Sequence, residues 1–179
     1  VVEAGCKVAI GTGLKRAGWD AEAAYMAQRG IEMFIGNWRR TGQFRENFSS
    51  IDGTGGGQAY QSWSPLFALI GLDEAIDVEP WGGLRFGSLT ELNSKVERVN
   101  VAGHTYDVSI GQKTILIQDG SELFQAAGPV VVRDWANDGK TLKFRTHTIR
   151  ALKATITVGS FKKDIDIPAG WKDFSIGVK

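Results

Sequence analysis

The chain has 179 residues, of which 42% are hydrophobic and 23% charged, and its formal net charge is +1. This composition is typical of a folded globular protein, and the balanced charge gives no basic surface for nucleic acid. No apolar stretch reaches the roughly 20 residues of a membrane-spanning helix, so we expect no membrane partner. Cys6 is the only cysteine, which excludes an internal disulfide and cysteine-based zinc motifs. We expect no metal and no cofactor. The chain begins at Val1, so its N-terminus does not indicate a cellular location.

The first part of the chain has the periodicity of helices. Residues 3–17 predict a short helix, and a second is expected from Asp20, as N-cap, to about Trp38. Its apolar residues recur at spacings of three and four, which places them on one face. A third helix is predicted over 63–76. The first two helices, joined by a short turn, predict an αα-hairpin.

Two glycine-containing segments interrupt this helical part. Residues 41–62 are expected to form a long loop that includes Gly53 to Gly57. A loop of this length in a compact domain is usually functional or disordered. Residues 81–87 are expected to form a turn-rich linker.

Beyond about residue 90 the pattern is mostly that of strands. Short alternating segments are separated by turn signals such as Ala102-Gly103 and Asp138-Gly139. The series favours an antiparallel sandwich or sheet. Strands are predicted over 96–101, 105–110, 113–118, 129–134, 141–148, 154–160 and 173–178.

A motif spans the loop at 41–62. Trp38 ends the preceding helix, Glu46-Asn47-Phe48 follows, and after the glycines comes Tyr60-Gln61-Ser62-Trp63-Ser64-Pro65. This order resembles the C-terminal signature of inverting (α/α)6-barrel glycoside hydrolases. Trehalases, processing α-glucosidase I and mannosylglycerate-hydrolase-like enzymes carry it. The resemblance covers about residues 8–90, because Leu69–Glu74 and Gly83–Leu89 look like the last barrel helix and its exit.

The resemblance implies an α+β fold with two domains. Residues 1–90 would be the C-terminal αα-hairpins of an (α/α)6 toroid, and residues 91–179 a small antiparallel β-domain. Six hairpins complete such a barrel, but only about a hairpin and a half fits before residue 90. The resemblance therefore implies an upstream barrel portion or a partner chain.

The resemblance also implies the chemistry. Glu46 occupies the position of the general base, and the reaction would hydrolyse O-glycosidic bonds of glucosides or mannosides with inversion. Such enzymes need a second carboxyl group roughly 6.5–9.5 Å away as the acid. In the relatives this acid is an aspartate upstream of the matched segment, so the chain alone is expected to be nearly inactive. The residues expected to bind the carbohydrate substrate are Trp38, Arg45, Asn47, Tyr60, Gln61 and Trp63.

Other interpretations of these residues remain open. Glu46 can be an ordinary exposed loop glutamate, since most glutamates are exposed. Trp38 continues the apolar face of its helix, which favours core packing, and Asp52 before Gly53 fits an Asx turn. At the level of function, the alternatives are a non-catalytic carbohydrate-binding module and a structural interaction domain.

Overall fold

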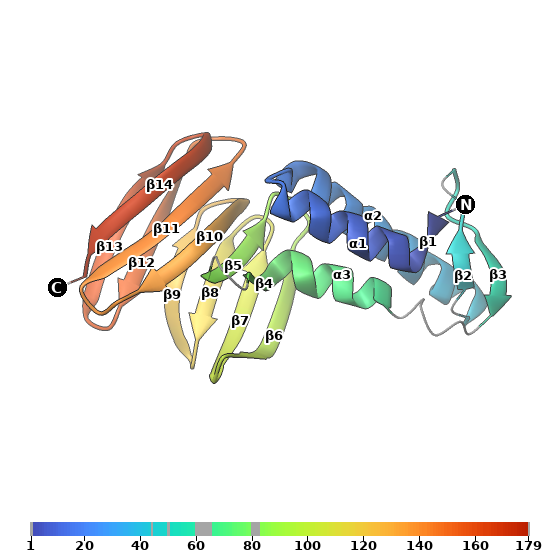
Figure 1. The fold of residues 1–179 in the computed structure, drawn as a ribbon, viewed down its shortest axis with the longest axis horizontal. Helices are drawn as coiled ribbons and strands as arrows, with labels where there is room; N and C mark the ends of the chain where they lie inside the picture. Colours follow the sequence, from blue (N-terminus) through green and yellow to red (C-terminus); the bar gives the residue numbers. More distant parts are fainter. Residues whose placement is uncertain (1, 44, 50, 60–65, 80–82, 179) are drawn as a thin grey trace. The chain divides into compact units, whose positions relative to one another are not determined.

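The computed structural model describes residues 2–43, 45–49, 51–59, 66–79 and 83–178 (Figure 1). The structure is mostly β, with 53% strand and 24% helix in three helices. Its internal contacts divide the chain into two compact units, Val1–Glu74 and Ala75–Lys179.

The first unit contains the helices α1 (Ala4–Arg16), α2 (Asp20–Thr41) and most of α3 (Leu66–Ala75). α1 and α2 form the predicted hairpin. The N-cap of α2 is Trp19, so the prediction that Asp20 holds this position was wrong; Asp20 is the first helical residue and is fully buried. Gly42 caps the C-terminal end of α2; it is left-handed (φ 63°) and donates its N–H to the Trp38 carbonyl at 2.7 Å. Glycine is the residue that adopts this C-terminal geometry without strain.

A small apolar core holds the first unit together. Ala27 of α2, Phe48 and Ile70 of α3 are buried against one another, with Met33 and Phe34 packed around them. α1 is joined to α3 by a buried lysine. The Nζ of Lys15 donates to the carbonyl of Asp73 at 2.6 Å, in the last turn of α3. A cation at that position also interacts favourably with the helix dipole.

The first unit also carries a three-stranded antiparallel sheet. Its strands are β1 (Val2–Glu3), β2 (Arg45–Phe48) and β3 (Gly55–Ala59), in the order β1-β2-β3. The expectation that residues 41–62 form a loop without regular structure was therefore wrong. β3 pairs although three of its residues are glycine. Its pairing comes from the neighbouring strand and not from its own propensity.

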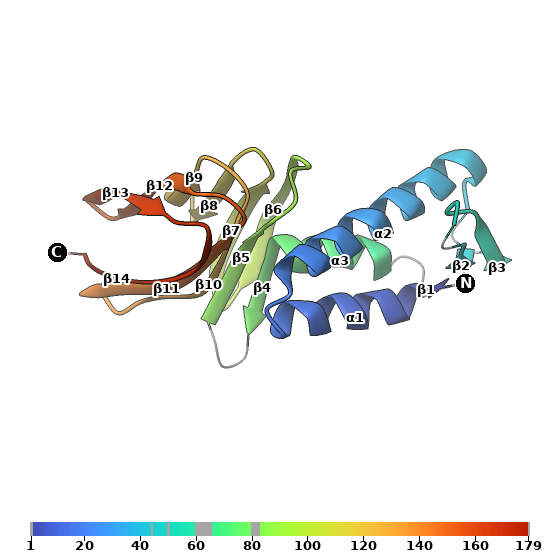
Figure 2. The same ribbon diagram turned by 90° about the horizontal axis from the view of Figure 1, so that it is seen from above.

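The second unit is a sandwich of two antiparallel sheets, which Figure 2 shows as facing layers. The five-stranded sheet has the order β14-β11-β10-β5-β4, and the six-stranded sheet the order β13-β12-β9-β8-β7-β6. The strands of the first are β4 (Ile76–Glu79), β5 (Gly83–Ser88), β10 (Val130–Asn137), β11 (Thr141–Thr148) and β14 (Gly170–Gly177). Those of the second are β6 (Ser94–Val101), β7 (His104–Ile110), β8 (Thr114–Gln118), β9 (Ser121–Ala126), β12 (Leu152–Val158) and β13 (Phe161–Ile167).

Aromatic side chains fill the space between these two sheets. The Trp135 ring lies 5.5 Å from Phe86, 6.0 Å from Phe124 and 5.2 Å from Phe144, measured between centroids. Phe124 comes from the six-stranded sheet and the other rings come from the five-stranded sheet. The alternation along β11, in which Leu142, Phe144, Thr146 and Thr148 are buried, directs its apolar residues into this core.

The two outer strands of the six-stranded sheet are built differently from the inner ones. β13 exposes Lys162, Lys163 and Asp164. β6 shifts register against β7 between Val96 and Val99, and Arg98 in this bulge has a φ of 58°. Both edges therefore carry charge, and one of them is also bent.

The prediction of an (α/α)6 toroid was wrong. The described chain contains three helices and three antiparallel sheets, so it is not a helical toroid. The predicted linker at 81–87 overlaps the buried strand β5, which pairs with both β4 and β10. The strands predicted beyond residue 90 each overlap a strand of the structure, whereas β9 and β13 had not been predicted.

Candidate functional site

Glu46 lies at a bulge between β2 and β3. Arg45 pairs with Ala59 and Asn47 pairs with Gly56, so Gly57 and Gln58 together oppose Glu46. Gly57 has a φ of 71°, in the left-handed region. A left-handed glycine at the first bulged position is the pattern of a G1 bulge, a device that redirects a side chain and is common beside active sites. The bulge therefore sets the direction of the Glu46 side chain.

The carboxylate of Glu46 is held by the backbone of the bulge. Its Oε2 accepts the N–H of Gln58 at 3.2 Å. A Cβ atom at position 57 would lie 2.5 Å from this oxygen and 2.9 Å from the Glu46 Cβ. Glu46 thus occupies space that only a glycine at position 57 leaves open. A carboxylate has about four acceptor positions, so one backbone bond orients the group and leaves it capacity to accept from water.

The surrounding glycines are packed closely against polar side chains. A Cβ at Gly55 would lie 2.5 Å from the Arg45 Cγ and 2.7 Å from the Asn37 Oδ1. The Arg45 Nη1 donates to the Gly57 carbonyl at 3.3 Å. Asn37 is buried and its Nδ2 donates to the Gln43 carbonyl at 3.0 Å. These bonds join the end of α2, β2 and the glycine segment into one structure.

The predicted substrate-binding residues are only partly described. Asn47 follows Glu46 on β2, and its amide lies near Gly56 and Gly57, within 3.2 Å of the Cβ positions these glycines lack. Arg45, which precedes Glu46 on β2, also contacts this glycine segment. Trp38 lies near the end of α2 and is 44% exposed. The other three predicted residues, Tyr60, Gln61 and Trp63, lie outside the described residues.

Asp52 forms the Asx turn that its sequence indicated. Its Oδ1 accepts the backbone N–H of Thr54 at 3.0 Å and the Thr54 hydroxyl at 2.8 Å. The Thr54 backbone bond, the Thr54 hydroxyl and then the Ser49 hydroxyl lower the pKa of Asp52 to about 2. The group is therefore ionised near neutral pH and is unsuited to act as a general acid.

The low pKa of Asp52 predicts how the stability that this turn contributes depends on pH. Because the folded pKa of Asp52 lies below its ordinary value of 3.8, its contribution to stability is present above 3.8 and is lost as the pH falls through about 2. We expect carboxyl-carbon NMR titration to give a midpoint near 2 for Asp52. Thr54→Val removes one of the two Thr54 bonds and should raise this midpoint. An ordinary midpoint in the unaltered protein would show that the turn does not form.

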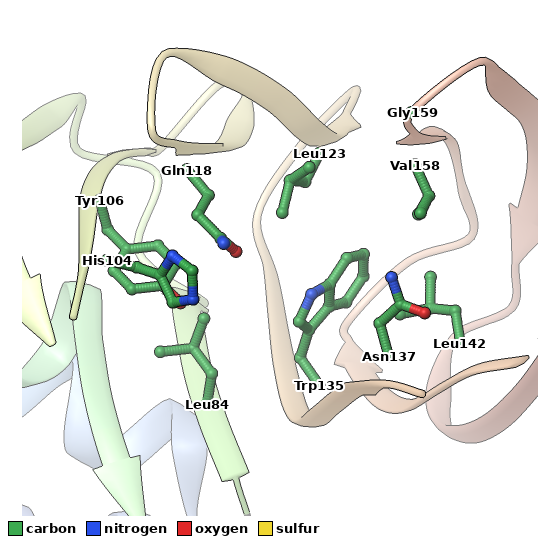
Figure 3. Close-up of a pocket in the computed structure, with 10 residues that line it drawn as sticks. All are labelled: Leu84, His104, Tyr106, Gln118, Leu123, Trp135, Asn137, Leu142, Val158 and Gly159. Carbon is green, nitrogen blue, oxygen red and sulfur yellow. The ribbon is translucent and has the colours of Figure 1, made fainter. Parts of the chain in front are cut away.

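A second candidate site, which had not been predicted, lies in the second unit. It is a pocket of about 340 Å³ between the two sheets (Figure 3). The lining residues come from several strands between β5 and β12 and from the turn after β12, so no local motif marks them. The pocket is lined by Leu84, His104, Tyr106, Gln118, Leu123, Trp135, Asn137, Leu142, Val158 and Gly159.

His104 at this pocket is oriented by Asp119. The His104 Nδ1 lies 2.7 Å from the Asp119 Oδ2, while the Asp119 Oδ1 accepts the Thr105 N–H at 2.9 Å. These two bonds, the backbone bond first, lower the pKa of Asp119. The carboxylate therefore stays charged in the pH range in which histidine titrates, and it fixes which ring nitrogen faces it.

No helix among the described residues is long and apolar enough to cross a membrane. The same residues contain no group of three or more His, Cys, Asp or Glu side chains placed to hold a metal ion. No family model, no curated protein and no solved structure matches this chain.

Proposed function

We propose that this chain supplies the general base of a glycoside hydrolase, and that Glu46 is this base. The observation that carries the proposal is the bulge opposite Glu46, where Gly57 leaves space for the carboxylate and the Gln58 N–H orients it. The proposal rests on this local geometry and on the Glu-Asn-Phe motif. It does not rest on the toroid, which the fold rules out for the described chain.

In the proposed reaction, the Glu46 carboxylate accepts a proton from water. The water oxygen bonds to the anomeric carbon as the glycosidic C–O bond breaks, and the leaving oxygen takes a proton from a carboxylic acid. In the family that the motif resembles, that acid is an aspartate from another part of the protein. Binding of Oε2 by the Gln58 N–H would leave Oε1 to face the water. The product is the sugar of inverted configuration.

Asn47 and Arg45 have different parts in this proposal. The Asn47 amide lies at the same glycines as Glu46 and offers both a donor and an acceptor, which suits a sugar hydroxyl. Arg45 holds the Gly57 carbonyl, so we assign it the positioning of the glycine segment. The carbohydrate class remains that of glucosides and mannosides.

The experiment is a hydrolysis assay of the natural protein that contains this sequence. The substrates are trehalose and the aryl α-glucoside and α-mannoside, and NMR identifies the first anomer released. Glu46→Gln should lower kcat about a hundredfold or more, because a neutral amide does not accept the proton of water. The first product should have the inverted configuration.

Glu32→Gln is the matched control. Glu32 lies on α2 in the same unit, and its carboxylate forms an exposed pair with Arg29 at 2.9 Å. It should keep the activity of the unaltered protein, because exposed pairs of this kind contribute little. Equal activity in the Glu46 and Glu32 variants, or release of the retained anomer, would refute the assigned role.

A further inference from the structure

The pocket of the second unit has the size and construction of a small-ligand site. Its volume of about 340 Å³ lies within the range of about 300–1,000 Å³ common for such sites. It opens between the two sheets, so both contribute to its walls. Every described residue that lines it belongs to the second unit. The site is therefore distinct from Glu46 and does not depend on the proposed catalytic function.

The floor of the pocket is a fixed aromatic ring. Trp135 is 8% exposed, and its ring is packed against those of Phe86, Phe124 and Phe144. Figure 3 shows the indole standing between the side chains of the two walls. A ring held on several sides loses little freedom when a ligand binds, so its remaining exposed surface is a ready apolar contact.

Polar groups from both sheets face this ring. Gln118 extends its amide toward the pocket, and Asn137 does so from the opposite wall (Figure 3). The Asn137 Oδ1 accepts the Gly139 N–H at 2.9 Å, which fixes the amide and leaves its Nδ2 for a ligand. His104 is likewise fixed through Nδ1 by Asp119. Burial, and secondarily the Asp119 charge, raise the pKa of Tyr106, so its hydroxyl keeps its proton.

The chemistry of this lining selects among ligands. The described residues that line it include no aspartate, glutamate, lysine or arginine, and His104 already faces the Asp119 carboxylate. A phosphate or another strongly charged group would therefore lack a free counter-charge in the pocket. A purely apolar ligand would cover the polar groups and leave their remaining hydrogen-bonding positions without partners, which is unfavourable. A pyranose avoids both penalties, because it is uncharged, has an apolar C–H surface, and carries hydroxyls that donate and accept.

We propose that this pocket binds a neutral pyranose sugar, with Trp135 under the ring and with Gln118, Asn137 and His104 bonded to its hydroxyls. Two of these polar groups are oriented before binding by bonds to Gly139 and Asp119. Two amides and an imidazole recognise the sugar hydroxyls in this assignment, so a charged derivative of the same sugar binds more weakly.

The test is an NMR titration of the full chain with glucose, mannose, galactose and trehalose. The signals followed are the Trp135 indole N–H and the side-chain amides of Gln118 and Asn137. At least one neutral sugar should shift these signals in a saturable way, and its 6-phosphate should bind at least about tenfold more weakly because the charge lacks a partner. Absence of a saturable shift with every sugar would overturn the proposal.

Two substitutions test whether the sugar binds in this pocket. Gln118→Leu should weaken it about tenfold, the cost of one lost hydrogen bond. Gln125→Leu is the matched control, because Gln125 lies on the neighbouring strand β9 and does not line the pocket. Equal effects of the two substitutions would contradict the assignment.

Glu46→Gln separates this site from the proposed catalytic site. The shifts at Trp135 should persist in that variant whether or not its hydrolytic activity is lost. Loss of sugar binding in Glu46→Gln, together with full binding in Gln118→Leu, would place the sugar at Glu46 and overturn the pocket assignment. Tighter binding of a nucleoside such as adenosine than of any sugar would also overturn it.

Discussion

Gly87→Ala is expected to destabilise the second unit by roughly 4 kcal/mol or more, a large effect for a single methyl group. Gly87 lies on β5 opposite Val131, with a φ of 85°. The added Cβ would overlap the carbonyl oxygen of Val130 and approach the Thr114 Cγ2 to 3.0 Å. The obstructing atom is backbone in the neighbouring strand, so relief requires that the two strands separate.

Denaturant unfolding followed by circular dichroism measures this loss. Gly120→Ala is the matched control, because Gly120 has a φ of 80° and nothing lies within 4 Å of the position of its Cβ. The control bears only the conformational cost of a left-handed alanine, roughly 1–2 kcal/mol. If both variants lost the same amount of stability, the close packing of β5 against β10 would be disproved.

Gly57→Ala is expected to abolish most of the hydrolytic activity proposed for Glu46 while the protein remains folded. The new Cβ would lie 2.9 Å from the Glu46 Cβ and 2.5 Å from its Oε2. The carboxyl end can rotate away, but the Glu46 Cβ is fixed by its strand, so the bulge must change shape. A displacement of about 1 Å in a catalytic group can cost about a hundredfold in rate.

Kinetics and thermal unfolding of the same samples distinguish geometry from stability. Gly42→Ala serves as the control within the first unit, because Gly42 has a φ of 63° and nothing within 4 Å of its Cβ position. It should lose stability but keep kcat. Full activity in Gly57→Ala would show that the bulge does not position a catalytic group.

The helices and several strands could be predicted because their own residues repeat with the right period. α2 and β11 are examples, and both fall close to the predicted ranges of 20–38 and 141–148. β5 was mistaken for a linker because it begins at Gly83 and contains Gly87, which are local signals for a turn. Its pairing with β4 and β10 decides its structure, and that information is not local.

The charged residues of β13 are the reason that this strand was not predicted. β13 carries Lys162, Lys163, Asp164 and Asp166, which have low strand propensity, and it pairs through its backbone with β12. β3 was missed for a related reason, since glycines dominate it. In each case the partner strand supplies what the sequence of the segment lacks.

The two candidate sites differ in how far the sequence could reveal them. Glu46, Arg45 and Asn47 are consecutive, so a motif marked them, although the bulge that orients Glu46 depends on pairing with β3. The pocket in the sandwich takes His104 from β7, Gln118 from β8, and Trp135 and Asn137 from β10. Only the order of strands in the two sheets brings those residues together, and a single sequence does not give that order.

The outer strands of the six-stranded sheet bear on how the molecule behaves at high concentration. An unpaired strand edge is a template on which another chain can add a strand, and such addition leads to aggregation. The exposed lysines and aspartates of β13 make it costly to bring a second copy alongside, and the bulge at Arg98 bends β6 away from a straight pairing partner. The charged residues that kept β13 from being predicted as a strand therefore also limit the addition of a strand from another chain at this edge.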